Sequence, residues 1–96
     1  MNKPIKDPFI EILPTKDVHG ETSDSVRYIV NDFVQDNYKL RNKSLVIIHG
    51  KGSGILRKAV HSTLKSNKFV EKYHIYGMND GCTIVYLSLD KQLKIW

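Results

Sequence analysis

Two short stretches of the 96-residue chain carry residue types that could do acid–base and phosphate chemistry. The first is the tetrapeptide Asp17-Val18-His19-Gly20, and the second is the segment from His49 to Gly54, with the sequence HGKGSG. Asp17 and His19 are two positions apart, so in an extended chain both side chains point to the same side. There the carboxylate can orient the imidazole. Such a pair commonly supports a general acid or base. The alternative is that Asp17 caps the following turn and His19 is an ordinary loop residue.

The glycine-rich segment favours contact with phosphate, although it matches neither common nucleotide motif. A Walker A loop needs four residues between its first glycine and Gly-Lys-Ser/Thr, whereas Lys51 follows Gly50 directly. The dinucleotide fingerprint G-x-G-x-x-G is one residue longer than the glycine spacing here. Glycines still let the backbone approach a phosphate, while the alternative is a helix entry that only needs positive φ. The candidate phosphate-binding residues are Gly50, Lys51, Gly52, Ser53, Gly54, Arg57 and Lys58.

The apolar pattern predicts the elements that position these two stretches. Helices are expected over roughly residues 23–39 and after Gly54, because apolar residues recur there at helical spacing. The four-residue run from Leu45 to Ile48 is typical of a strand buried on both faces. The glycine-rich segment therefore lies between a strand and the start of a helix, where free backbone amides attract anions.

A hairpin is predicted near the end of the chain, with strands at 72–76 and 82–89 joined by turn residues 77–81. Three prolines limit the residues before Thr15 to an arm or an edge strand. The order strand, helix, strand, helix, strand, strand predicts an α/β (α+β) two-layer sandwich, with a small mixed sheet covered by two helices. If the first two strands are parallel neighbours, both stretches open at the edge where such sheets bind ligands.

Composition excludes several classes of protein. The longest unbroken apolar runs are four residues, against roughly 18 needed to cross a bilayer, so a membrane-spanning protein is excluded. No apolar segment of a secretory signal follows the first residues, which predicts a cytoplasmic location. A formal charge of +5 favours polyanionic partners such as nucleic acid. One cysteine and four unclustered histidines predict no disulfide and no structural metal, so His61 and His74 are interpreted as surface or packing residues.

Further basic and aromatic residues could widen a nucleic-acid contact around the two stretches. Taken alone, such residues usually form only a solvated face, so their value lies in combination with the two stretches. The candidates for a basic rim are Lys39, Arg41, Lys43, Arg57, Lys58, Lys65, Lys68 and Lys72, and those for base stacking are Tyr28, Tyr38, Tyr73 and Tyr76.

The two motifs, the helices that follow them and the closing strand at 81–87 (GCTIVYL) together resemble the Smr (small MutS-related) domain. The resemblance implies an Smr-like domain over residues 15–90, preceded by an arm at 1–14 and followed by a tail at 91–96. It implies a two-layer sandwich like the C-terminal domain of a bacterial translation initiation factor. Smr domains occur alone or at the C-terminus of bacterial MutS paralogues. The implied partners are branched DNA or RNA, including messenger RNA on stalled ribosomes.

The resemblance carries the family's Asp-x-His motif onto Asp17 and His19, and its glycine motif onto the segment from His49 to Gly52. Two departures are visible: Lys16 replaces the usual hydrophobic residue before the aspartate, and the glycine-rich turn before the last strand is reduced to Asn79-Asp80-Gly81. The first departure bears on the strand register near Asp17, and the second on how a nucleic-acid strand crosses the hairpin.

The leading hypothesis is an endonuclease in which His19 is the general acid or base, Asp17 orients it and His49 is a second candidate proton carrier. Lys51 and the loop amides would stabilise charge on the phosphate. RNA needs no metal, since its 2′-hydroxyl can attack, whereas DNA needs an activated water, for which Mg²⁺ or Mn²⁺ is expected. The alternatives are a non-catalytic module that binds nucleic acid or the ribosome, and a binder of small nucleotides.

Overall fold

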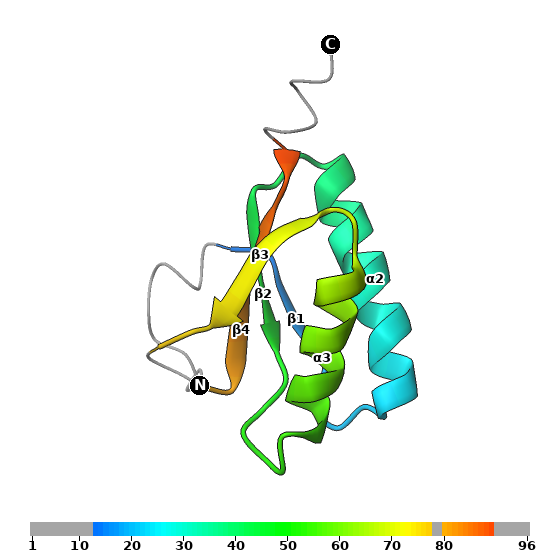
Figure 1. The fold of residues 1–96 in the computed structure, drawn as a ribbon, viewed down its shortest axis with the longest axis vertical. Coiled ribbons are helices and arrows are strands. Elements are labelled where there is room, and N and C mark those ends of the chain that lie inside the picture. The colour runs from blue at the N-terminus through cyan, green and yellow to red at the C-terminus, as the bar shows by residue number, and fades with distance from the viewer. Residues whose placement is uncertain (1–12, 78–79, 90–96) are drawn as a thin grey trace, which may run out of the picture.

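The secondary structure alternates between strands and helices before it closes with a hairpin. The computed structural model describes residues 13–77 and 80–89. Figure 1 shows the two helices lying side by side on one face of a single sheet. The predicted order and the α+β two-layer arrangement are confirmed. The elements are β1 (Thr15–Asp17), α2 (Ser23–Lys39), β2 (Ser44–Ile48), α3 (Ile55–Ser66), β3 (Val70–Ile75) and β4 (Cys82–Leu87).

The four strands pair in the order β1-β2-β4-β3. β1 and β2 are parallel, with Asp17 opposite Ile48, whereas β4 is antiparallel to both β2 and β3. The predicted hairpin is the β3–β4 pair, but β3 begins at Val70 rather than at residue 72, because Val70 pairs with Leu87 across a bulge. The parallel β1–β2 pair places the two motif stretches at one edge of the sheet, as expected.

The hydrophobic core lies between the sheet and the two helices. Helical spacing places Val26, Val30 and Val34 of α2 on one face, where all three are fully buried. Leu45 and Ile47 point from β2 toward these valines, and the alternate residue Val46 faces the other side of the sheet. Each such fully buried side chain stabilises the fold by about 1.5–3 kcal/mol. This core holds the ends of β1 and β2 in place beside the start of α3.

The ends of the helices are built differently. The Thr22 side chain accepts a hydrogen bond from the Ser25 amide at 3.1 Å, which caps the start of α2. α3 follows Gly54, whose φ of +89° lies in the left-handed region and which offers no side-chain cap. The Ile55 amide donates a long hydrogen bond of 3.4 Å to Oγ of Ser53, the residue before Gly54. The amides that follow in the first turn of α3 receive no cap from Gly54, which is the arrangement that a phosphate can use.

Other expectations concern the chain ends and membranes. The predicted arm at 1–14 and tail at 91–96 fall almost wholly outside the described residues. Leu13, the first described residue, packs against Val46, Cys82 and Ile84 on the sheet face away from the helices. No helix in the described part of the chain is long and apolar enough to cross a membrane.

Candidate functional site

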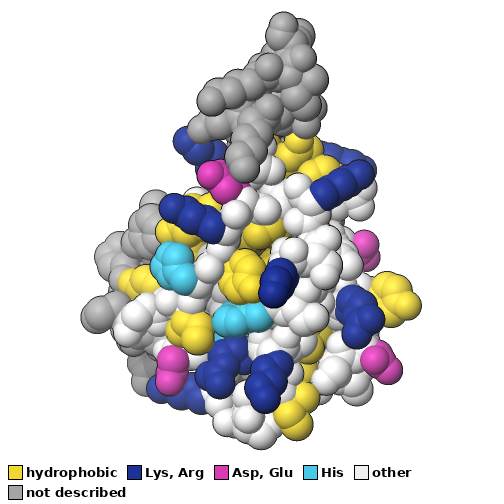
Figure 2. Space-filling model, in the orientation of Figure 1, with side chains coloured by type: hydrophobic (Ala, Val, Ile, Leu, Met, Phe, Trp, Pro, Cys, Tyr) yellow, Lys and Arg dark blue, Asp and Glu magenta, His cyan; other side chains and the backbone are white. Residues whose placement is uncertain are grey.

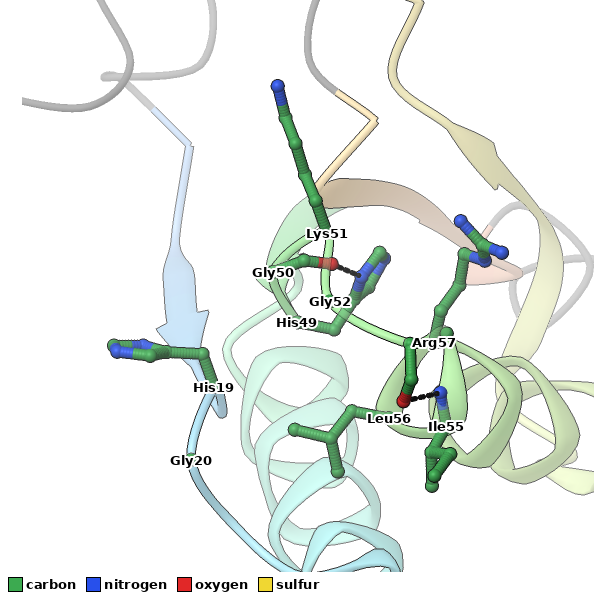
Figure 3. A pocket seen from close by; sticks show the side chains of 11 residues that line it. His19, Gly20, His49, Gly50, Lys51, Gly52, Ile55, Leu56 and Arg57 are labelled. Atoms are coloured by element: carbon green, nitrogen blue, oxygen red, sulfur yellow. Dashed lines mark hydrogen bonds between the residues drawn. The ribbon is translucent and has the colours of Figure 1, made fainter.

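The two motif stretches meet at the edge of the sheet and enclose a cavity of about 370 Å³. His19 and Gly20 lie on one side of it, and the glycine loop, defined as residues 49–54, lies on the other (Figure 3). A Cβ atom added to Gly50 would lie 3.6 Å from the Cβ of His19, so the two stretches face each other with little more than the width of one carbon atom between them. The start of α3, from Ile55 to Arg57, completes the lining.

His19 is held by Asp17 and stays open to solvent. Its Nδ1 atom lies 2.7 Å from Oδ1 of Asp17, and its backbone amide donates to the same oxygen at 3.0 Å. The side chain is 70% exposed, and in Figure 3 its imidazole points away from the glycine loop. The hydrogen bond to Asp17, and then the charge of Asp17, raise the pKa of His19 above its ordinary 6.5. His19 therefore presents Nε2 outward and favours the protonated form, as a general acid requires.

His49 lies in the opposite environment, with only 4% of the residue exposed. Its Nδ1 lies 3.0 Å from the carbonyl oxygen of Gly50, and its Nε2 lies 2.8 Å from Oγ1 of Thr83. Burial lowers the pKa of His49, and the charge of Arg57 adds to this effect. Both ring nitrogens of His49 are thus hydrogen-bonded within the protein. The hypothesis of His49 as a second proton carrier did not include these two bonds.

The backbone of the glycine loop is fixed by its neighbours. The amides of His49 and Gly50 both donate to the carbonyl of Gly81, at 2.9 and 3.0 Å, which ties the loop to the turn before β4. Gly50 has φ +82°, a left-handed conformation that favours glycine. The helix entry with positive φ that the sequence offered as the alternative is found at Gly54, directly before α3, and it coexists with the cavity of about 370 Å³.

Positive charge surrounds the loop. Lys51 Nζ lies 3.6 Å from Oδ1 of Asp80, and both side chains are exposed. The Arg57 guanidinium lies close to Gly54. A Cβ atom added to Gly54 would be 3.1 Å from a guanidinium nitrogen of Arg57. Lys58 is exposed on the next position of α3. Figure 2 shows Lys and Arg side chains gathered over the end of the molecule that carries the loop and the start of α3. The loop and the start of α3 thus place cations beside the cavity, as phosphate binding favours.

Comparison with known proteins identifies the chain. The family model of the Smr domain matches residues 16–88. The chain belongs to the Smr domain family. Endonuclease MutS2 of Agathobacter rectalis is 39% identical over 62 residues, which is 65% of this chain and 8% of that protein. Endonuclease MutS2 of Clostridium kluyveri (strain ATCC 8527) is 42% identical over 75 residues, or 75% of this chain and 10% of that protein. The chain thus spans about a tenth of the length of these curated relatives.

Two solved Smr structures share the fold. The crystal structure of the Smr domain of Thermus thermophilus MutS2 superposes with a TM-score of 0.77 at 28% identity, covering 79% of this chain and 99% of that one. YdaL, a stand-alone small MutS-related protein from Escherichia coli, gives a TM-score of 0.72 at 23% identity, over 76% of this chain and 63% of that one. The resemblance inferred from the two motifs is confirmed, and so is the α+β fold.

Three residues outside the motifs, His61, Tyr38 and Tyr73, make contacts within the domain that the sequence interpretation did not include. His61 is a half-buried member of a polar network, since its Nε2 lies 2.8 Å from Thr83 Oγ1, a contact that a surface or packing role does not include. Tyr38 stacks on Phe69 with ring centroids 4.2 Å apart, and Tyr73 packs on His61 and the core. These two tyrosines are therefore not available for base stacking.

The predicted basic rim is divided between two ends of this Smr domain. Lys39, Arg41 and Lys43 lie at the end of α2 and before β2, whereas Arg57 and Lys58 lie at the start of α3, at the other end of the sheet (Figure 1). Within residues 13–77 and 80–89, no group of three His, Cys, Asp or Glu side chains is placed to hold a metal ion.

Proposed function

We propose that this Smr domain binds nucleic acid through the glycine loop and cleaves a phosphodiester bond with His19 as its general acid. The observation that carries the proposal is the His19–Asp17 pair at the rim of a cationic, glycine-lined cavity. The imidazole supplies the proton, and the cavity supplies the charge and the amides that a phosphate needs. The MutS2 relatives, which are named endonucleases, support the same reaction class.

With RNA, the 2′-oxygen attacks phosphorus, and the bond from phosphorus to the 5′-oxygen breaks. His19 donates the Nε2 proton to the departing 5′-oxygen, and the 2′-hydroxyl proton passes to solvent water. The products are a 2′,3′-cyclic phosphate and a free 5′-hydroxyl. Asp17 keeps the imidazole oriented through Nδ1 and favours its charged form. No metal takes part in this route.

With DNA there is no 2′-hydroxyl, so the nucleophile must be water. Activating that water calls for a divalent ion, and Mg²⁺ or Mn²⁺ is the proposed co-reactant for this substrate. Branched DNA and RNA, including messenger RNA on ribosomes, remain the candidate substrates. The two routes differ in their products and in their response to a chelator, which makes them separable by experiment.

A non-catalytic nucleic-acid or ribosome binding module is the second candidate, and one observation favours it. Both ring nitrogens of His49 are engaged within the protein, and the imidazole of His19 points away from the glycine loop (Figure 3). Binding requires only the amides and cations of the loop, whereas efficient cleavage also needs a group to accept a proton. Binding alone would therefore be consistent with the geometry.

The test uses labelled RNA and branched DNA, each with EDTA, Mg²⁺ or Mn²⁺, and compares the unmodified protein with Asp17→Asn and His19→Ala. His74→Ala is the matched control, because His74 is an exposed histidine on β3 that does not line the cavity. Cleavage that is lost in Asp17→Asn and His19→Ala but kept in the control supports the nuclease. Substrate that is bound but intact under every condition supports the binding module instead.

A further inference from the structure

One buried hydroxyl group lies between two imidazoles behind the glycine loop. Thr83 Oγ1 is 2.8 Å from Nε2 of His49 and 2.8 Å from Nε2 of His61. Thr83 is fully buried in β4, His49 follows β2 and His61 belongs to α3, so the contact joins three elements. The two rings are perpendicular, with centroids 6.0 Å apart. Among the described residues no buried side-chain polar atom lacks a hydrogen-bond partner.

The proton positions in this network follow from what each atom can do. The Gly50 carbonyl can only accept, so Nδ1 of His49 must carry the proton that it donates at 3.0 Å. In the neutral ring Nε2 of His49 is then an acceptor, and it takes the hydroxyl proton of Thr83. The Thr83 oxygen in turn accepts from Nε2 of His61. Burial lowers the pKa of both histidines, which favours these neutral forms.

This chain of hydrogen bonds ends at the peptide between Gly50 and Lys51 in the glycine loop. Because a trans peptide is planar, its carbonyl and its N–H point in opposite directions. Figure 3 shows the Gly50 carbonyl held toward His49. The planar peptide therefore turns the Lys51 amide away from His49. In the described part of the chain no group accepts a hydrogen bond from that amide. Gly50 and Lys51 both line the cavity.

We propose that Thr83 and His61 are positioning residues, which fix the tautomer of His49 and thereby hold the Gly50–Lys51 peptide with its amide free for a phosphate. The role rests on the proposed phosphate binding by the loop, and it assigns to Thr83 and His61 a function that lies outside both sequence motifs. A role in packing alone would need the volume of these side chains but not the direction of their hydrogen bonds.

The first test reads the tautomers directly by ¹⁵N NMR of the imidazole rings at pH 7.5. We expect His49 to carry its proton on Nδ1 and His61 to carry its proton on Nε2. Thr83→Val keeps the shape of the side chain but removes the hydroxyl, so the His49 and His61 rings should both become mixtures of tautomers and the Lys51 amide resonance should shift. Thr83→Ser keeps the hydroxyl and should leave both signals unchanged. A proton on Nε2 of His49 in the unmodified protein would overturn the proposal.

The second test measures binding of single-stranded RNA at low salt by the same variants. Thr83→Val should weaken binding about tenfold, the value of one lost hydrogen bond to a charged group, and Thr83→Ser should stay within about twofold of the unmodified protein. Equal affinity for all three proteins would show that the network only packs the core. If Thr83→Val does not fold, His61→Phe removes the donor at the half-buried end of the network, with His74→Phe as its control.

Failure of the proposed function gives a different pattern. If the unmodified protein binds neither RNA nor DNA, the nucleic-acid proposal is wrong, and the binding comparison cannot be made. Titration with inorganic phosphate then decides the positioning role. The Lys51 amide resonance should respond to phosphate in the unmodified protein and in Thr83→Ser, and about tenfold more weakly in Thr83→Val. The same response in all three proteins would overturn the positioning role by itself.

Discussion

Gly50 faces His19, and a Cβ atom added to Gly50 would lie 3.6 Å from the Cβ of His19. That separation would be an ordinary van der Waals contact, so space does not forbid a larger residue at Gly50. The backbone disfavours one, because φ is +82° there. The left-handed conformation of Gly50 thus belongs to the place where the glycine loop comes nearest to the acid–base stretch.

Replacing Gly50 with alanine should therefore destabilise the domain by about 1–2 kcal/mol, the cost of holding an L-residue in the left-handed region. It should also weaken nucleic-acid binding, because the loop moves relative to His19. Gly52→Ala is the matched control, since Gly52 has open space around its Cβ position and no positive φ. Urea unfolding of both variants measures the difference. Equal unfolding midpoints would show that the conformation of Gly50 is not required.

The pKa of His19 sets the expected pH dependence of cleavage. Asp17 raises this pKa above 6.5, so the imidazole is protonated at lower pH and loses its proton as the pH rises through the raised value. The cleavage rate of the unmodified protein should fall over that same range, and Asp17→Asn should move the titration midpoint of the His19 ring downward toward 6.5. NMR titration of the His19 ring gives the pKa directly. An unchanged midpoint in Asp17→Asn would contradict the assigned cause.

The buried histidines predict a loss of stability in mild acid. His49 and His61 have pKa values below 6.5, mainly because of burial, and both also lie near the positive charge of Arg57. The unfolded chain therefore binds protons more readily, so stability is complete above about pH 6.5 and declines as the pH falls through the lowered values. Urea midpoints at pH 7.5 and pH 5.0 measure the decline. His61→Phe should reduce it, and His74→Phe should not.

The ion pair between Lys51 and Asp80 competes with nucleic acid for the lysine. Asp80→Asn should release Lys51 and tighten binding about twofold to threefold at low salt, because exposed ion pairs are worth less than about 1 kcal/mol. Added salt should reduce the gain. Lys51→Ala should weaken binding and lower the salt slope by about one. Binding isotherms at several salt concentrations test both variants. Weaker binding by Asp80→Asn would mean that Asp80 itself contacts the ligand.

The features that could be predicted from the sequence are those fixed by neighbours along the chain. Side chains two positions apart in an extended segment share a side, which predicts the Asp17–His19 pair. Helical spacing of apolar residues predicts the buried face of α2. The partnership of His61 with Thr83 could not be predicted, because the two residues are 22 positions apart and meet only through the packing of α3 on β4. For the same reason the hydrogen bond of His49 Nε2 could not be predicted, because its partner Thr83 lies 34 positions away along the chain.

The proposed reaction requires that His19 transfer a proton during phosphodiester cleavage. Single-turnover cleavage of end-labelled RNA by saturating amounts of the unmodified protein, His19→Ala and His74→Ala, with EDTA present, tests this requirement. We expect a 2′,3′-cyclic phosphate product, a rate at least about a hundredfold lower for His19→Ala, and an unchanged rate for His74→Ala. Equal cleavage by His19→Ala and the unmodified protein would rule out His19 as the general acid.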